Sequence, residues 1–207
     1  KDGIRDYKVT GVQTCALPIL LALVWLTGAL PAEWKGHDAL VFAVAFSPDG
    51  KQLATAGFDK AVKVFSAADG KLIHHIPAHA GPVYAVAFSP DGKLLASSGL
   101  DGLVKLWNAA DGKPVREFKG HAGLVDCIRF TPDGGTLVSC GQDATVRTWT
   151  VADGKQVKEM KGHAGPVYAV ALSPDGKTAA SAGQDKTVRL WDLRSEEHTS
   201  ELQSPCN

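Results

Sequence analysis

Histidine recurs along this chain at a fixed interval of 42 residues, at His37, His79, His121 and His163. Aspartate recurs at the same interval, at Asp59, Asp101, Asp143 and Asp185. A fixed period of this size is typical of arrays in which each repeated unit buries its apolar face against its neighbours. The repeat also bears on function, because a residue that is present in every unit belongs more often to the architecture than to one reactive site.

Each unit contains short apolar or alternating runs bounded by turn signals, the pattern typical of strands joined by hairpins. In the third unit these runs cover residues 125–130, 136–140, 145–149 and 156–160. Strands of about five residues are the usual length in globular proteins. No segment has the apolar spacing and the length of an amphipathic helix. The sequence therefore predicts an all-β fold with four strands in each unit.

The turns between these runs repeat as well. Ser47-Pro48-Asp49-Gly50 has a counterpart in each of the three later units, at 89–92, 131–134 and 173–176. Proline presets φ at the first central position of such a turn, and glycine supplies the left-handed residue that closes it. A second turn, Asp69-Gly70, recurs at 111–112 and 153–154 and is expected to join the outer two strands.

A Gly-His pair (Ala78-His79 in the second unit), a Ser or Thr in the second strand, an Asp in the next turn and, in three units, a Trp in the third strand follow one another. This pattern resembles the WD-repeat β-propeller family over residues 34–193. The resemblance implies four-stranded antiparallel blades, with repeats at 34–76, 77–118, 119–160 and 161–193. Each repeat begins with the outer strand of the preceding blade. We expect a fragment of about four blades that forms an open arc.

The resemblance also implies a structural hydrogen-bond chain in each blade, from Trp through Ser or Thr and His to Asp. An indole N–H only donates, hydroxyl and imidazole groups do both, and a carboxylate only accepts, so every link can be satisfied. The residues implied are Trp107, Ser97, His79 and Asp101 in blade two, Trp149, Ser139, His121 and Asp143 in blade three, and Trp191, Ser181, His163 and Asp185 in blade four. Blade one has Thr55, His37 and Asp59. Its tryptophan position holds Phe65, which cannot donate, so this blade is expected to be the least firmly held.

The two ends of the chain do not follow the repeat. Residues 194–204 and 9–19 are translations of opposite strands of one DNA sequence that looks like a short-read sequencing adapter. We therefore interpret residues 1–19 and 194–207 as non-native tails. Residues 20–32 read LLALVWLTGALPA, which matches the hydrophobic region of a secretory signal peptide and is too short to span a bilayer. Residues 20–33 are thus a signal-peptide remnant in this interpretation, although a buried strand of an earlier blade is the alternative.

The net charge of the repeats gives no reason to expect nucleic acid or an acidic membrane as a partner. Residues 34–193 hold 18 Lys and Arg against 16 Asp and Glu, a net charge of +2.

Cys127 and Cys140 fall on neighbouring expected strands, where buried thiols are the simplest interpretation and a cross-strand disulfide is the alternative. An exported protein is expected if the signal interpretation holds, and a cytoplasmic one otherwise.

No catalytic constellation and no cofactor motif stand out in the sequence. The repeated histidines are not expected to bind metal, because ligands must converge within about 2 Å of one ion and one histidine per blade keeps them apart. Function should then come from a surface on a rigid scaffold. By the resemblance, the candidate partner-binding rim comprises Phe42, Phe58, Tyr84, Leu100, Asp126, Gln142, Tyr168 and Gln184. Packing between blades is the alternative role of these side chains.

The sequence favours a non-enzymatic scaffold that binds a protein or peptide and belongs to a larger WD-repeat protein. One alternative is the propeller portion of an exported enzyme or redox protein whose catalytic or haem domain lies elsewhere. A second alternative is the regulatory propeller of an intracellular signalling enzyme.

Overall fold

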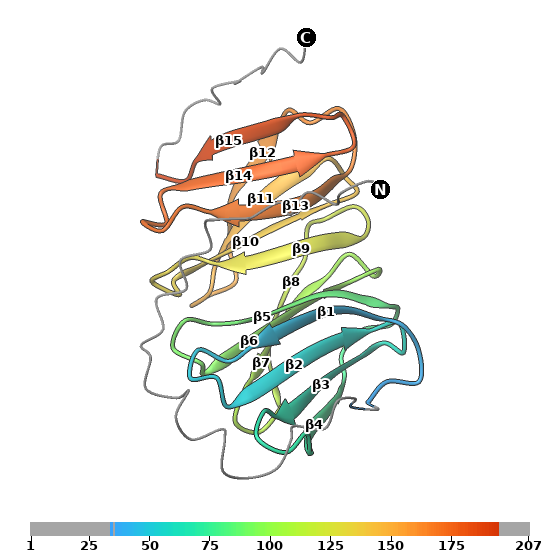
Figure 1. The fold of residues 1–207 in the computed structure, drawn as a ribbon. Coiled ribbons are helices and arrows are strands. Elements are labelled where there is room, and N and C mark those ends of the chain that lie inside the picture. Colours follow the sequence, from blue (N-terminus) through green and yellow to red (C-terminus); the bar gives the residue numbers. More distant parts are fainter. Residues whose placement is uncertain (1–33, 35, 195–207) are drawn as a thin grey trace, which may run out of the picture. The chain divides into compact units, whose positions relative to one another are not determined.

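The computed structural model describes residue 34 and residues 36–194 of the 207-residue chain. The expected signal-peptide remnant and the two expected tails, apart from Arg194, lie outside the described residues. Every regular element between these limits is a β-strand, and the strands form four separate antiparallel sheets (Figure 1). The expectation of an all-β fold is confirmed.

Each sheet is a meander in which consecutive strands pair with one another. The first consists of β1 (Val41–Phe46), β2 (Gln52–Gly57), β3 (Ala61–Ser66) and β4 (Leu72–Pro77). The second consists of β5 (Val83–Phe88), β6 (Leu94–Gly99), β7 (Val104–Asn108) and β8 (Pro114–Phe118). We call these sheets blades one and two.

Blades three and four continue the pattern. Blade three consists of β9 (Val125–Phe130), β10 (Thr136–Gly141), β11 (Thr145–Thr150) and β12 (Gln156–Lys161). Blade four has three described strands, β13 (Val167–Leu172), β14 (Thr178–Gly183) and β15 (Val188–Asp192). The strands expected in the third repeat therefore begin at the predicted residues, and three of them extend one residue further.

The repeated Pro-Asp-Gly turn, which follows Ser47, Ser89, Thr131 or Ser173, connects the first two strands of every described blade. In blade one the amide of Gly50 donates to the carbonyl of Ser47 at 2.9 Å, and the amide of Ser47 donates to the carbonyl of Gln52 at 2.9 Å. Gly50 has a φ of 69°, in the left-handed region that glycine adopts without a steric penalty. The Ser47 hydroxyl also accepts from the Gln52 amide at 2.9 Å. Proline, glycine and serine thus each have a separate role in closing this hairpin.

The apolar core lies between successive blades and not within any one of them. Ala54, Val62 and Val64 of blade one pack against Val86 and Leu95 of blade two. A second cluster joins blade two to blade three through equivalent residues, and a third joins blade three to blade four. Each described blade therefore depends on a neighbour to bury its faces, as expected for a repeat array.

Blades one and four each have one face that packs against no other described blade, and these faces are exposed. Val44 and Phe46 on β1 are each 64% exposed, and Val188 on β15 is 59% exposed. The described residues therefore do not close into a ring, in agreement with the open arrangement that the sequence predicts.

Candidate functional site

The repeated Trp, Ser, His and Asp residues lie within hydrogen-bond distance of one another in blades two, three and four. In blade three, His121 Nδ1 lies 2.9 Å from the Asp143 carboxylate, and His121 Nε2 lies 2.7 Å from the Ser139 hydroxyl. The indole N–H of Trp149 donates to the same hydroxyl at 2.8 Å. The corresponding distances in blades two and four lie between 2.7 and 2.9 Å.

These contacts fix the direction of each hydrogen bond in blade three. The carboxylate of Asp143 only accepts, so the adjacent Nδ1 of His121 carries the proton in the neutral imidazole. Nε2 then accepts from the Ser139 hydroxyl, whose oxygen accepts in turn from the Trp149 indole. The His121 side chain is 1% exposed, so each lost link would leave a buried polar group without a partner.

The aspartate at the end of each chain also caps a tight turn. Asp143 accepts from the backbone amides of Ala122 at 3.1 Å and of Thr145 at 3.2 Å. The residue between Asp143 and Thr145 is Ala144, with a φ of 61°, a left-handed conformation that non-glycine residues seldom adopt. These hydrogen bonds hold the turn in that conformation and join it to the segment that follows His121.

The charge states of the buried pairs follow from their surroundings. Burial lowers the pKa of His79 and of His121, although their aspartate partners act in the opposite direction. Burial alone would raise the pKa of Asp101 and of Asp143, but the partner histidine and the backbone amides outweigh it and lower both values. A neutral imidazole beside an ionised carboxylate is therefore the stable state near neutral pH.

Blade one differs because Phe65 occupies the position of the indole donor. His37 still contacts Asp59 at 2.8 Å and the Thr55 hydroxyl at 2.6 Å. The ammonium group of Lys63 lies 3.1 Å from the Asp59 carboxylate and donates to the carbonyl of Gly36. The Lys63 side chain is 8% exposed, so blade one has a buried ion pair but no indole link.

The three rim rings of blades one and two lie together, and Leu100 stands in blade two at the position of Phe58. The ring of Phe42 stacks on the ring of Tyr84 in the next blade with a centroid distance of 4.6 Å, and it lies 5.9 Å from the ring of Phe58. Phe42, Phe58 and Leu100 are 43%, 47% and 50% exposed. Tyr84 is half-buried. We call these four residues the aromatic rim.

The equivalent rim residues of blades three and four are more polar. Gln142 and Gln184 are exposed at the positions of Phe58 and Leu100, and Tyr168 is 51% exposed. Asp126 is half-buried at the position of Tyr84, and its Oδ2 atom is buried without a hydrogen-bond partner among the described residues. Burial raises the pKa of Asp126 to about 6, with a smaller contribution from Cys127.

Cys127 and Cys140 are free, buried thiols on directly opposite positions of β9 and β10. The Cys127 thiol lies 3.8 Å from the carbonyl oxygen of Val170 in blade four. Hydrogen bonding to Cys127 and burial raise the pKa of the Cys140 thiol. The pair is part of the apolar cluster between blades three and four, where alanine or serine stands in the equivalent positions of the other blades.

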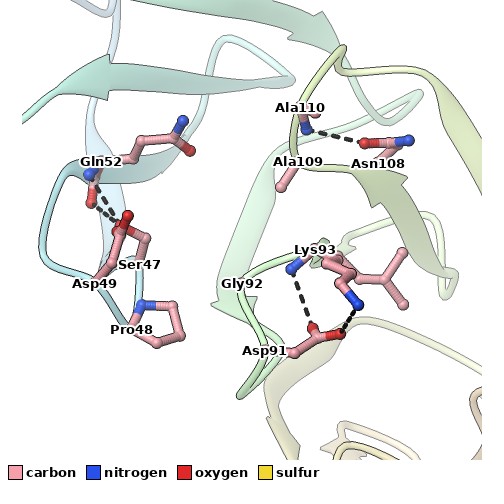
Figure 2. Close-up of a pocket in the computed structure, with 11 residues that line it drawn as sticks. Ser47, Pro48, Asp49, Gln52, Asp91, Gly92, Lys93, Asn108, Ala109 and Ala110 are labelled. Atoms are coloured by element: carbon pink, nitrogen blue, oxygen red, sulfur yellow. Dashed lines mark hydrogen bonds and ion pairs between the residues drawn. The ribbon is translucent and has the colours of Figure 1, made fainter.

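A groove of about 580 Å³ lies at the opposite end of β1 from Phe42, between the Ser-Pro-Asp-Gly turns of blades one and two (Figure 2). Its polar groups already have partners within their own turns. Asp91 accepts from the Ser89 hydroxyl at 2.6 Å and from the Lys93 amide at 3.0 Å, and Asn108 accepts from the Ala110 amide at 2.9 Å. A smaller groove of about 260 Å³ lies between the corresponding turns of blades three and four, so the feature follows from the repeated architecture.

Comparison with known proteins agrees with this geometry. The family model described as "WD domain, G-beta repeat" matches residues 28–66, 70–108, 112–150 and 154–192. This chain is a WD-repeat protein. The chain is also similar to a solved structure titled "Structure of U3-55K", with a TM-score of 0.76 and 30% sequence identity. The match covers 80% of this chain and 52% of that chain.

Similar curated proteins match over about one repeat. "Notchless protein homolog" of Arabidopsis thaliana is 45% identical over 47 residues, which is 23% of this chain and 10% of that protein. "Ribosome assembly protein 4" of Saccharomyces cerevisiae is 48% identical over 42 residues, which is 20% of this chain and 8% of that protein. This WD-repeat chain thus spans a small part of the relatives that it matches.

Among residues 34 and 36–194, no three His, Cys, Asp or Glu side chains are grouped closely enough to hold a metal ion. The same residues include no helix of the length and apolarity needed to cross a membrane.

Replacing His121 by alanine should lower the free energy of unfolding by about 1–3 kcal/mol, because Ser139 and Asp143 would lose their buried partner, and the cavity left behind would add to that cost. His37→Ala should cost less, because blade one has no indole donor to lose. Urea unfolding followed by tryptophan fluorescence measures both. Equal losses for the two variants would contradict the stabilising role of the complete chain.

Asp126→Asn should raise stability at pH 8 and lose that advantage in acid. The folded pKa of Asp126, about 6, exceeds its ordinary value of 3.8, so the ionised form opposes folding above pH 6 and this cost fades between pH 6 and pH 4. We expect a gain of about 1 kcal/mol at pH 8, below the full value of the shift, because water still reaches the carboxyl group.

The matched control is Asp133→Asn on the same blade. The Thr131 hydroxyl lowers the pKa of Asp133, so the neutral amide should bring no gain at pH 8. The comparison uses the urea midpoints of the unaltered chain, Asp126→Asn and Asp133→Asn at pH 8, 6 and 4. A gain for Asp126→Asn that is unchanged at pH 4 would contradict the assignment to a buried carboxylate.

Proposed function

We propose that this WD-repeat chain is a non-catalytic scaffold that binds a protein or peptide partner through the aromatic rim of Phe42, Phe58, Tyr84 and Leu100. The observation that carries the proposal is the exposure of these apolar side chains beside the packed interface between blades one and two. Phe42, Phe58 and Leu100 are each at least 43% exposed, whereas Val83 and Val86 on the neighbouring strand are 0% and 4% exposed. Apolar groups gathered on a surface are typical of sites that bind a partner.

The rim also has the rigidity that tight binding favours. Phe42 belongs to β1 and Tyr84 to β5, and their stacked rings hold each other in place across the two blades. Leu100 rests against Gly81, where a Cβ atom would lie only 3.1 Å from the Leu100 Cβ. Aromatic side chains held in this way contribute area with little loss of conformational entropy, which is why they are enriched among residues that dominate binding energy.

The buried His, Ser and Asp residues support the absence of catalysis in this proposal. A catalytic histidine must reach its substrate, but the side chains of His79, His121 and His163 are at most 1% exposed and have both ring nitrogens occupied. WD repeats typically act without catalysis, and one of the similar proteins is named for ribosome assembly. That similarity covers about one repeat, so it supports a scaffold without naming its partner.

Peptides selected from a display library on the immobilised chain would test the proposal, with affinity measured by calorimetry. A Phe58→Ala/Leu100→Ala double variant should weaken binding by about tenfold or more, which corresponds to about 1.4 kcal/mol. The matched control is Gln142→Ala/Gln184→Ala, which changes the same positions of blades three and four and should leave affinity within about twofold. An equal loss in both variants, or none in either, would refute the aromatic rim as the binding surface.

A further inference from the structure

The first strand of each blade contains one residue that has no partner on the second strand. In blade one, Val41 and Ala43 pair with consecutive residues of β2, so the intervening Phe42 is left in a β-bulge. The bulge recurs at the same position of the three later blades, where the extra residues are Tyr84, Asp126 and Tyr168. A bulge changes the direction in which a strand presents its side chain, and bulges are common beside functional sites.

These four residues form a row across the blades, which we call the bulge row. The first strands of successive blades, β1, β5, β9 and β13, pack side by side. The stacked rings of Phe42 and Tyr84 show that two neighbours in the row touch. Asp126 is the one charged member, with Tyr84 before it and Tyr168, which is 51% exposed, after it. Asp126 therefore lies inside the array, between two blades that the structure describes.

The Asp126 carboxylate has no partner among the described residues. Its Oδ2 atom is buried without a hydrogen bond, and no cation contributes to its charge state. Asp143 of the same blade, in contrast, accepts from His121 and from two backbone amides. Asp126 as a whole is half-buried, so a partner can reach it from the surface.

This carboxylate is a cost to the folded chain. Burial raises the pKa of Asp126 to about 6, so above that pH the side chain holds a negative charge that nothing nearby compensates. Groups whose charge is disfavoured by their surroundings gather at functional sites, because a ligand can supply what the fold does not. The counter-charge missing here is positive.

We propose that Asp126 binds a basic side chain, lysine or arginine, of the partner that the aromatic rim holds. The inference rests on the proposed function, because it adds a second contact with the same partner next to Tyr84. A cation supplies the charge-assisted hydrogen bond that the carboxylate lacks. The faces of tyrosine rings also attract cations, and Tyr84 and Tyr168 stand on either side of Asp126 in the row. The apolar residues of blades one and two thus anchor the partner, and Asp126 selects for a basic residue.

Peptides from the display selection test the inference through one substitution on each side of the contact. Asp126→Asn removes the charge with little change in volume, and citrulline or acetyl-lysine does the same for an arginine or a lysine of the peptide. Asp126→Asn should weaken binding by about tenfold, although the same change should stabilise the folded chain. Neutralising the matching basic residue should weaken binding by a similar factor, and the two changes together should cost no more than either alone.

The matched control is Asp133→Asn, which removes a carboxylate in the turn that follows β9 and should leave affinity within about twofold. Unchanged affinity of Asp126→Asn for peptides that Phe58→Ala/Leu100→Ala weakens would overturn this inference and leave the proposed function standing. Selected peptides that contain no basic residue would do the same. If no peptide binds, or if the Phe58→Ala/Leu100→Ala variant binds as well as the unaltered chain, both proposals fail.

Discussion

A buried imidazole has two nitrogen atoms that both require partners, and the rest of each blade is arranged around this requirement. His121 meets it with a carboxylate on one side and a hydroxyl on the other, and the hydroxyl accepts in addition from an indole. This chain of hydrogen bonds connects four parts of a blade. They are the segment before the first strand, the second strand, the third strand, and the turn between the second and third strands. The hydrogen bonds fix the relative positions of these parts more specifically than apolar contacts do, because a hydrogen bond depends on direction as well as distance.

Packing between blades provides the second constraint. Each described blade buries apolar residues against a neighbour, so the repeat stabilises an array of blades. Among the described residues, Val44 of β1 and Val188 of β15 remain exposed. The hydrogen-bond chains set the shape of a blade, and the interfaces set how blades follow one another. Residues outside these two roles, above all the aromatic rim, are free to vary between repeats. At the rim this variation is visible as Phe58 and Leu100 in two blades and glutamine in the other two.

The sequence predicted the strands and turns because their signals are local. A Pro-Asp-Gly turn and an alternating run of five or six residues act within a few positions, and β9 begins and ends where the pattern of residues 125–130 indicates. The stacking of Phe42 on Tyr84 depends on how two blades pack, and the burial of one Asp126 oxygen depends on the surroundings of its strand. Neither is visible in residue type and spacing. The ion pair of Lys63 with Asp59 has an i, i+4 spacing, but its burial required the structure.

If each hydrogen-bond chain acts as one unit, a double-mutant cycle between His121→Ala and Trp149→Phe will show coupling between its two ends. If Ser139 transmits the interaction, the loss of either end weakens the contribution of the other. We therefore expect a coupling energy of about 1 kcal/mol in the free energy of unfolding. The control is a cycle between His121→Ala and Trp191→Phe, which belong to the separate hydrogen-bond chains of blades three and four. Their effects on the free energy of unfolding should be additive within about 0.5 kcal/mol. Additive losses for His121→Ala and Trp149→Phe would show that Ser139 does not couple the two ends.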